Sequence, residues 1–191
     1  MLTIRPAVPG DARACVPLIV DAIGDIALTL TVEPTVSRAA GALRAFFQED
    51  EEDDNRLSYR NAWVAEVDGH MAGVLVAYDG ARARMLDWPF LRRAWALTDN
   101  THYVIEEETE AGEFYVDTVS VRAAYQGRGV GTQLVQFAVA LARERGFPRV
   151  TLLVDEGNVG ARRLYERLGF EVAGTRSIGG HAYWRLSHPL A

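Results

Sequence analysis

The sequence contains no lysine, so arginine supplies every permanently positive side chain. A Schiff-base lysine, a pyridoxal-phosphate anchor and the phosphate-binding lysine of a P-loop are therefore excluded. A phosphate bound by this chain must be held by backbone N–H groups and by arginine. One missing residue type thus removes several classes of enzyme.

Cysteine and long apolar runs are also scarce. Cys15 is the single cysteine, so the chain has no disulfide framework, and the apolar residues around it predict a buried small side chain. No apolar run approaches the ~20 residues of a membrane helix. The N-terminal stretch MLTIRPAVPGDA lacks the apolar core of a signal peptide. We therefore expect a cytoplasmic protein without a membrane partner.

The charge balance and the histidines disfavour two further classes. The formal net charge is −6, whereas nucleic-acid-binding proteins usually present a basic face. His70, His102, His181 and His188 are isolated and form no metal-ligand pattern. We expect neither a nucleic-acid partner nor a metal.

The length of 191 residues fits one domain spanning residues 1–191. Apolar periodicity predicts strands at about 2–7, 62–67, 70–78, 114–121, 149–154, 171–178 and 182–186. Helices are expected after Asp11, a candidate N-cap, then from about Ser37, after the glycines at 127–131, and from Asn158. Pro17 is expected to kink the first helix or delay its start. Hairpins alternate with helical crossovers, which predicts an α/β (α+β) fold: a mixed, mostly antiparallel sheet of about seven strands with helices on both faces.

Two acidic regions interrupt this pattern. The run at 49–54 is interpreted as a solvated loop rather than a cation site, because consecutive carboxylates repel one another. The segment at about 79–113 is expected to be irregular apart from a short helix from Phe90 to Leu97, and it carries a second acidic cluster at 106–110. Connections of this length are typical of functional lids, so we expect this insert to cover a site, on the side where a substrate that accepts a transferred group would bind.

The stretch from Phe114 to Phe147 combines an alternating strand, a glycine-rich turn and a long amphipathic helix. The N-terminus of a helix leaves backbone N–H groups unpaired and carries the positive end of the helix dipole, which suits a phosphate. A Rossmann fingerprint would lie near the start of the chain, and a P-loop would need a lysine. The turn therefore predicts a phosphate site of another kind.

Two motifs together resemble the GNAT superfamily of N-acetyltransferases. The turn QGRGVG at 126–131 fits the pattern Gln/Arg-x-x-Gly-x-Gly/Ala through Gln126, Gly129 and Gly131, directly after the strand segment Val-Ser-Val. Downstream, NVGARRLYERLGF at 158–170 fits Asn-x-x-Ala-x-x-x-Tyr-x-x-x-Gly-Phe. The expected element order is similar to the GNAT-like acyl-CoA N-acyltransferase fold from end to end, apart from the insert.

The resemblance implies that acetyl-CoA is the co-substrate. It places the pyrophosphate against backbone N–H groups of the turn and the pantetheine arm between two strands that splay apart. The residues implied in cofactor binding are Val119, Ser120, Val121, Gln126, Gly127, Arg128, Gly129, Val130, Gly131, Thr132, Asn158 and Ala161. Arg128 also fits a solvent-facing side chain, and Asn158 also fits a plain helix N-cap.

The resemblance further implies direct transfer of an acetyl group to a primary amine of a small molecule or peptide. Tyr165 matches the tyrosine that protonates the leaving thiolate. A structural tyrosine packed between helix and sheet would give the same sequence pattern. Many relatives carry a glutamate where this chain has Tyr115. Strand alternation places Tyr115, Asp117, Val119 and Val121 on one face, and a mid-strand aspartate is costly without a role. We therefore predict Asp117 as the general base or amine anchor, with a structural acceptor as the alternative.

Several alternatives remain open at this stage. One is a catalytically inactive CoA-binding sensor, which the presence of both Asn158 and Tyr165 disfavours. Others are the use of a different acyl-CoA, or acylation of a protein N-terminus or of an aminoacylated tRNA, the last of which the negative net charge disfavours. The carboxylates of the insert are expected to favour a cationic acceptor. The resemblance also suggests a homodimer.

Overall fold

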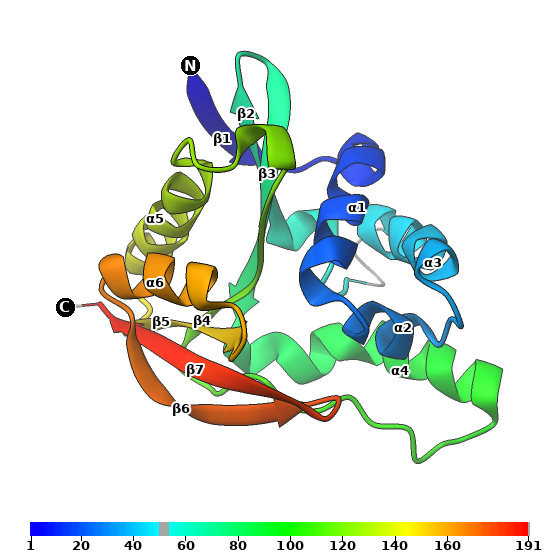
Figure 1. Cartoon of the computed structure of the whole chain (residues 1–191). Coiled ribbons are helices and arrows are strands. Elements are labelled where there is room, and N and C mark those ends of the chain that lie inside the picture. Colours follow the sequence, from blue (N-terminus) through cyan, green and yellow to red (C-terminus); the bar gives the residue numbers. More distant parts are fainter. Residues whose placement is uncertain (50–53, 191) are drawn as a thin grey trace.

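The computed structural model describes residues 1–49 and 54–190 and shows a seven-stranded sheet in the order β1-β2-β3-β4-β5-β7-β6 (Figure 1). The strands are β1 (Leu2–Pro6), β2 (Ala62–Val67), β3 (His70–Asp79), β4 (Phe114–Val121), β5 (Arg149–Asp155), β6 (Glu171–Ile178) and β7 (His181–Pro189). Within the described residues β4 and β5 pair in parallel and the other neighbouring strands pair antiparallel. The predicted mixed, mostly antiparallel sheet is confirmed.

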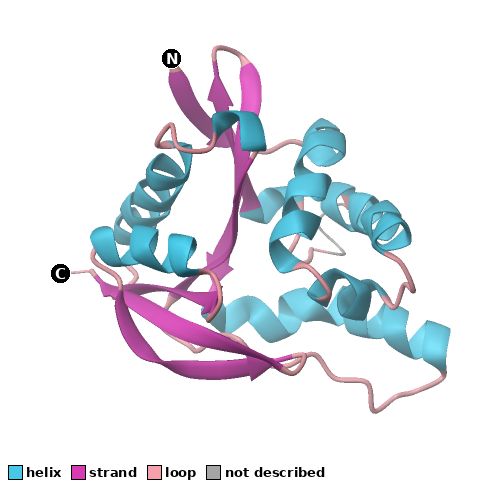
Figure 2. Ribbon diagram, in the orientation of Figure 1, coloured by secondary structure: helices cyan, strands magenta, loops and turns pink. Residues whose placement is uncertain are grey.

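Helices cover both faces of this sheet, as predicted (Figures 1 and 2). One face carries α1 (Ala12–Ile23), α2 (Ile26–Thr31) and α3 (Val36–Gln48), and the other carries α5 (Val130–Glu144) and α6 (Val159–Arg167). The insert forms α4 (Ala83–Thr98), which packs against α2. In the part of the chain that the structure describes, no helix combines the length and apolarity needed to cross a membrane.

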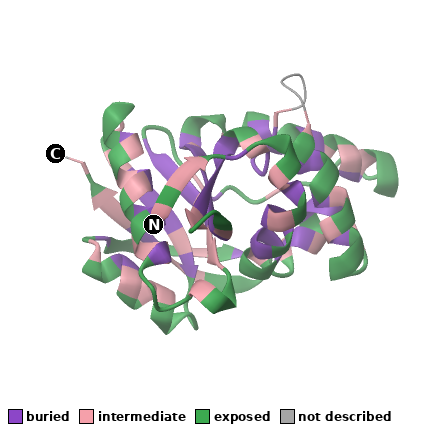
Figure 3. Cartoon of the chain, turned by 90° about the horizontal axis from the view of Figure 1, so that it is seen from above, coloured by how far each residue is buried: buried purple, intermediate pink, exposed green. Residues whose placement is uncertain are grey.

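The core consists of two main apolar clusters that share the sheet as a wall. Val74 and Val76 of β3 face the cluster under α1 and α3, whereas Leu75 and Ala77 face the cluster under α5. Successive strand residues point to opposite faces, so one buried strand serves both clusters. Cys15 is fully buried in the first cluster, as expected from its apolar surroundings. Figure 3 shows buried residues along the central strands and on the helices that flank them.

The first helical region differs in detail from the prediction. Asp11 precedes α1, but its carboxylate accepts the N–H of Val8 at 2.9 Å and pairs with Arg5 instead of capping that helix. Pro17 lies inside α1 without delaying its start at Ala12. The separate helix α2 was not predicted. It follows Gly24, which has a positive φ of 54° and is the C-cap residue that ends α1.

The helix in the insert is longer than the prediction of 90–97. It begins at Ala83 and continues through Pro89, which was expected to lie in an irregular segment. Proline removes one helical hydrogen bond. Here Leu86, Phe90 and Ala94 are fully buried on one side of α4, and packing of that side outweighs the local penalty. The Phe90 ring lies 4.2 Å from that of Phe46, between centroids.

The prediction of a solvated loop at 49–54 falls mostly on residues 50–53, which lie outside the described part of the chain. Asp54 is described, and it pairs with Arg82 at 2.9 Å.

Candidate active site

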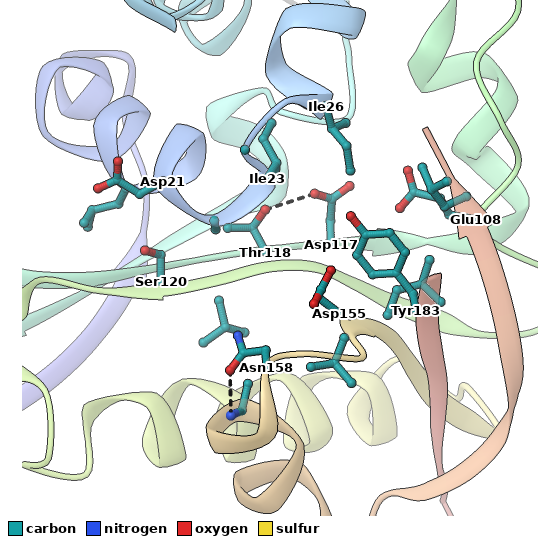
Figure 4. A pocket seen from close by; sticks show the side chains of 18 of the residues that line it. Asp21, Ile23, Ile26, Glu108, Asp117, Thr118, Ser120, Asp155, Asn158 and Tyr183 are labelled. Atoms are coloured by element: carbon teal, nitrogen blue, oxygen red, sulfur yellow. Dashed lines mark hydrogen bonds between the residues drawn. The ribbon is translucent and has the colours of Figure 1, made fainter. Parts of the chain in front are cut away.

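The two central parallel strands separate after a short paired segment. β4 and β5 pair at Phe114–Val150, Tyr115–Thr151 and Val116–Leu152, and no pairing between them continues beyond these positions. A cleft of about 780 Å³ opens where they diverge. Its walls come from the α1–α2 segment, the second half of β4, the end of β5, the start of α6 and the β6–β7 hairpin (Figure 4).

A β-bulge at Asp117 sets the faces of β4. Val76 pairs with Thr118 and Ala77 pairs with Val116, so Asp117 is the extra residue. The prediction that Tyr115, Asp117, Val119 and Val121 share one face is therefore wrong, because the bulge interrupts the alternation that the sequence pattern assumes. Val119 and Val121 pack in the cluster under α5, whereas Tyr115 packs on the opposite face beside α4.

The glycine-rich turn leaves a run of backbone donors open. Among the described residues, none of the six N–H groups from Gly127 to Thr132 has a hydrogen-bond acceptor. Gly127 and Gly129 have φ values of 71° and 81°, a region that other residues adopt at a steric cost. Gly129 precedes the first turn of α5, so these donors coincide with the positive end of a helix of 15 residues.

Neighbouring side chains hold this turn in place. Gln126 donates from Nε2 to the carbonyl of Val121 at 3.1 Å, which ties the turn to the end of β4. The Arg128 guanidinium lies 5.6 Å from the centre of the Tyr125 ring. At the start of α6, Asn158 accepts the N–H of Ala161 at 3.0 Å through Oδ1, so it is an N-cap whose amide nitrogen still borders the cleft.

The cleft brings together eight of the fourteen predicted site residues. These are Asp117, Val119, Ser120, Val121, Gln126, Asn158, Ala161 and Tyr165. The other six, Gly127, Arg128, Gly129, Val130, Gly131 and Thr132, do not line it and follow Gln126 along the chain. Val130 is the first residue of α5, and its side chain is buried in the apolar cluster under that helix, so only its backbone N–H is available to a ligand.

Tyr165 reaches the cleft from α6 and is 8% exposed. Its hydroxyl has no hydrogen-bond partner among the described residues. Burial raises the pKa of Tyr165 to about 12, so the phenol keeps its proton at neutral pH. A protonated donor without an internal partner is free to donate to a ligand in the cleft.

Asp117 is bound by Arg56, a buried arginine that no sequence motif marked. Its Oδ2 accepts from Arg56 Nε at 2.9 Å, from Arg56 Nη2 at 2.7 Å and from the Tyr78 hydroxyl at 2.9 Å, and its Oδ1 accepts from Thr118 at 3.0 Å. Both charged side chains are only 4% exposed. These contacts match the structural-acceptor alternative for Asp117 more closely than the general base.

The insert contributes a carboxylate to the same cluster. Glu108 accepts from Arg56 Nη2 at 2.7 Å and from the Tyr115 hydroxyl at 2.6 Å, and it lines the cleft. Tyr115, the strand position for which the resemblance suggested a glutamate, thus binds a glutamate from the insert. The sequence makes Glu106, Glu107, Glu108 and Glu113 further candidates for the base, more often solvated charges, but no local signal separates Glu108 from its acidic neighbours.

The other insert carboxylates are occupied elsewhere. Glu107 pairs with Arg84, Glu110 pairs with Arg176 at 3.0 Å, and Glu106 accepts the N–H of Gly179 at 2.6 Å. None of these three lines the cleft. Of the cluster at 106–110, Glu108 is the carboxylate placed to act on an acceptor.

Further carboxylates of the cleft come from positions that sequence reasoning missed. Asp155 is the last residue of β5, and Asp21 and Asp25 lie at the end of α1 and just beyond it. Figure 4 shows Asp117, Asp155 and the hydroxyl of Tyr183 directed toward the same space from three strands. Burial and the charges of Asp155, Glu108 and Asp25 raise the pKa of Tyr183, so these groups act on a common region.

Comparison with known proteins gives a consistent result. The sequence profile described as the Acetyltransferase (GNAT) family matches residues 29–170, well over half of the chain. The mycothiol acetyltransferase of Corynebacterium glutamicum is 42% identical over 72 residues, which are 38% of this chain and 24% of that protein. The 5-NmdU N-acetyltransferase of Pseudomonas phage PaMx11 is 40% identical over 78 residues, 41% of this chain and 53% of that protein. The chain thus spans a quarter to about half of these relatives.

Among solved structures, the N-acetyltransferase from Staphylococcus aureus Mu50 superposes with a TM-score of 0.77 at 25% identity, covering 97% of this chain and 99% of that one. The likeness therefore includes the insert and the N-terminal helices as well as the two motifs. On the family profile and the fold together, the predicted resemblance is confirmed, and this chain belongs to the acetyltransferase (GNAT) family.

Proposed function

We propose that this protein transfers an acetyl group from acetyl-CoA to a primary amine of a small molecule or peptide. The observation that carries the proposal is the divergence of β4 from β5 beside six open backbone N–H groups. A long thioester with a pyrophosphate at its far end fits that combination, because it needs a slot for its arm and an anion site for its charge. Bound acetyl-CoA supplies an activated acyl group.

The donor side uses backbone rather than side-chain charge. The N–H groups from Gly127 to Thr132 would hold the pyrophosphate, with Arg128 adding charge. Backbone of Val119, Ser120 and Val121 has no partner on β5 and is free to pair with the amides of the pantetheine arm as an added strand. Asn158 and Ala161 border the same slot from α6.

The sulfur end of the donor would lie near Tyr165. Its hydroxyl carries a proton and has no partner among the described residues, so it would donate to the charge that develops on sulfur. Such a donor contributes when it is desolvated and aligned, and its 8% exposure provides the first condition.

The acceptor amine would approach from the acidic side of the cleft. Arg56 is the single arginine among the lining residues, and it is held by Asp117 and Glu108. Asp21, Asp25 and Asp155 have no arginine partner among the described residues. The resulting negative field favours a cationic amine.

The amine must lose a proton before it attacks. Asp155 accepts the N–H of Gly157 at 2.8 Å through Oδ1, and its Oδ2 has no partner among the described residues, so it is free to receive a proton. Asp117 would serve as an anchor, because Arg56 and Tyr78 already occupy its Oδ2. Together they would hold the amine and its departing proton between β4 and β5.

The test combines calorimetry with an assay of free-thiol release. Acetyl-CoA is titrated into the protein, and thiol release is then followed with a panel of mono-, di- and aromatic primary amines and amino-terminal peptides. We expect saturable acetyl-CoA binding, amine-dependent thiol release and an acetylated product by mass spectrometry. Binding without release for any amine would favour the sensor alternative, and absence of binding would overturn the proposal.

A further inference from the structure

A second cavity of about 650 Å³ lies between α4 and the returning segment 104–111 of the insert. Arg56 and Glu108 line both this cavity and the candidate active-site cleft. None of the motifs that define the donor side reaches it. The cavity is therefore a separate space that shares one charged wall with the candidate active site.

The shape of this cavity is fixed by a close approach at Gly80. The Gly80 N–H donates to the carbonyl of Glu113 at 2.9 Å, and the Thr109 hydroxyl donates to the Gly80 carbonyl at 2.8 Å. A Cβ atom at Gly80 would lie 2.5 Å from the carbonyl oxygen of Glu110. The returning segment can lie against the start of α4 only because this residue is glycine. The close contact at Gly80 thus fixes the position of the segment that forms one wall of the cavity.

Part of the wall is apolar. Ala83, Leu91, Val104, Ile105 and Ala111 line it, together with the ring of Tyr78. Val104 is 73% exposed, which is costly for an aliphatic side chain that nothing covers. A ligand with an apolar body would remove this surface from water.

The charged part of the wall has one carboxylate in excess. Glu107 pairs with Arg84, Glu108 with Arg56, and Glu110 with Arg176. Asp87 has a single contact of 3.5 Å to Arg56 Nη1, at the limit of a hydrogen bond, and that guanidinium already binds two closer carboxylates. The Asp87 side chain is 13% exposed. Its Oδ2 accepts no hydrogen bond within residues 1–49 and 54–190, and that oxygen is accessible from the cavity that Asp87 lines.

A largely buried carboxylate in this condition has fewer hydrogen bonds from the protein than such groups normally have. Burial, the largest cause, raises the pKa of Asp87 to about 6, which still leaves it ionised at neutral pH. An ionised group with one distant partner is stabilised most by a cation that brings its own N–H donors.

We propose that the cavity between α4 and residues 104–111 binds a small ligand with an amidine, guanidine or ammonium group and an apolar body. The cationic group pairs with Asp87, and the apolar body lies against Leu91, Val104 and Ile105. The site is distinct from the acceptor cleft, and its occupant needs no acyl transfer to bind.

Benzamidine is a suitable probe, because it joins a planar cation to an apolar ring, and benzamide is its neutral counterpart of similar shape. Calorimetric titration of the 191-residue chain is expected to give saturable benzamidine binding, about tenfold or more tighter than benzamide. Asp87→Asn is expected to remove that difference. Asp155→Asn removes the same charge from the acceptor cleft, where a cationic amine is also favoured, and is expected to leave the Asp87-dependent binding of benzamidine unchanged.

A second variant guards against indirect effects of Asp87→Asn on folding. Ala111 is an exposed loop residue that lines the cavity, so Ala111→Leu is expected to fold and to weaken both probes. A crystal soaked with benzamidine should show the amidinium against Asp87. The proposal is overturned if benzamidine shows no saturable binding, or if Asp155→Asn weakens it while Asp87→Asn and Ala111→Leu do not.

Discussion

The donor side and the acceptor side of the cleft are built in different ways. The donor side comes from one continuous stretch, 114–170, and its binding groups are backbone N–H donors and two glycines with positive φ. The acceptor side is assembled from the α1–α2 segment, Arg56, the insert and β7. Its centre is a buried arginine whose partners lie 31, 52 and 61 residues away in the sequence.

This difference separates two kinds of interaction. Backbone donors at a helix start are fixed by local geometry, so the same motif forms on any sheet that provides the strand before it. A buried ion-pair cluster depends on several distant segments folding together. Removing one partner leaves the opposite charge buried without compensation. The donor side should therefore tolerate changes in the acceptor side, and the reverse should also hold.

The largest expected effect follows removal of Arg56. Arg56→Ala leaves Asp117, Glu108 and Asp87 buried without their cation, which should lower the free energy of unfolding in urea by about 3–5 kcal/mol. Arg84→Ala is the control, because the Arg84–Glu107 pair is largely exposed and is worth about 0–1 kcal/mol. If folded Arg56→Ala also lost acetyl-CoA affinity, the two sides would not be independent.

A substitution in the glycine-rich turn should act on the donor side instead of the acceptor side. Gly129→Val forces a β-branched residue to φ 81° and crowds the open N–H groups, so acetyl-CoA affinity should fall about 100-fold by calorimetry. Gly112→Val imposes a similar strain at φ 79° in the insert and should leave that affinity unchanged. Equal losses in the two variants would mean that strain, rather than the anion site, is responsible.

Tyr165 belongs to the donor side but acts on the chemistry. Tyr165→Phe should reduce kcat about 30-fold while the KM for acetyl-CoA changes little, because the hydroxyl is needed only as charge develops on sulfur. The urea midpoint should not move, since that hydroxyl has no internal partner among the described residues. Tyr103→Phe, which loses a bond to the Thr29 carbonyl, should leave kcat intact. An unchanged kcat in Tyr165→Phe would remove the residue from the mechanism.

The smallest expected effect concerns pH and Asp87. Burial raises its pKa from 3.8 to about 6, so between these values the native state binds more protons than the unfolded state. Asp87 therefore adds no penalty below about pH 4, and its penalty grows as pH rises to about 6 and is complete above it. Asp87→Asn should raise the free energy of unfolding at pH 7.5 by about 1–2 kcal/mol relative to its effect at pH 4. The measurement is urea unfolding at both pH values, with Asp99→Asn as the control. A pH-independent difference would contradict it.

Much of the scaffold was predictable because its signals are local. The alternating strand at 114–121, the turn and the N-cap at Asn158 each depend on residues within a few positions of one another. Predictions failed where long-range packing overrode a local signal. Pro89 lies inside α4 because one side of that helix is buried, and the face of Asp117 depends on a bulge opposite Val76 and Ala77.

The candidate site divides in the same way. The sequence by itself determined the family, the seven-stranded sheet and the donor motif, because backbone donors and glycine conformations are encoded by adjacent residues. Only the tertiary structure decided that Asp117 is bound to Arg56, that Glu108 rather than the whole acidic cluster reaches the cleft, and that Asp87 is left with one distant partner. The ion-pair partners of a buried carboxylate come from distant segments that only folding brings together. A run of acidic residues in the sequence therefore does not show which carboxylates will be paired.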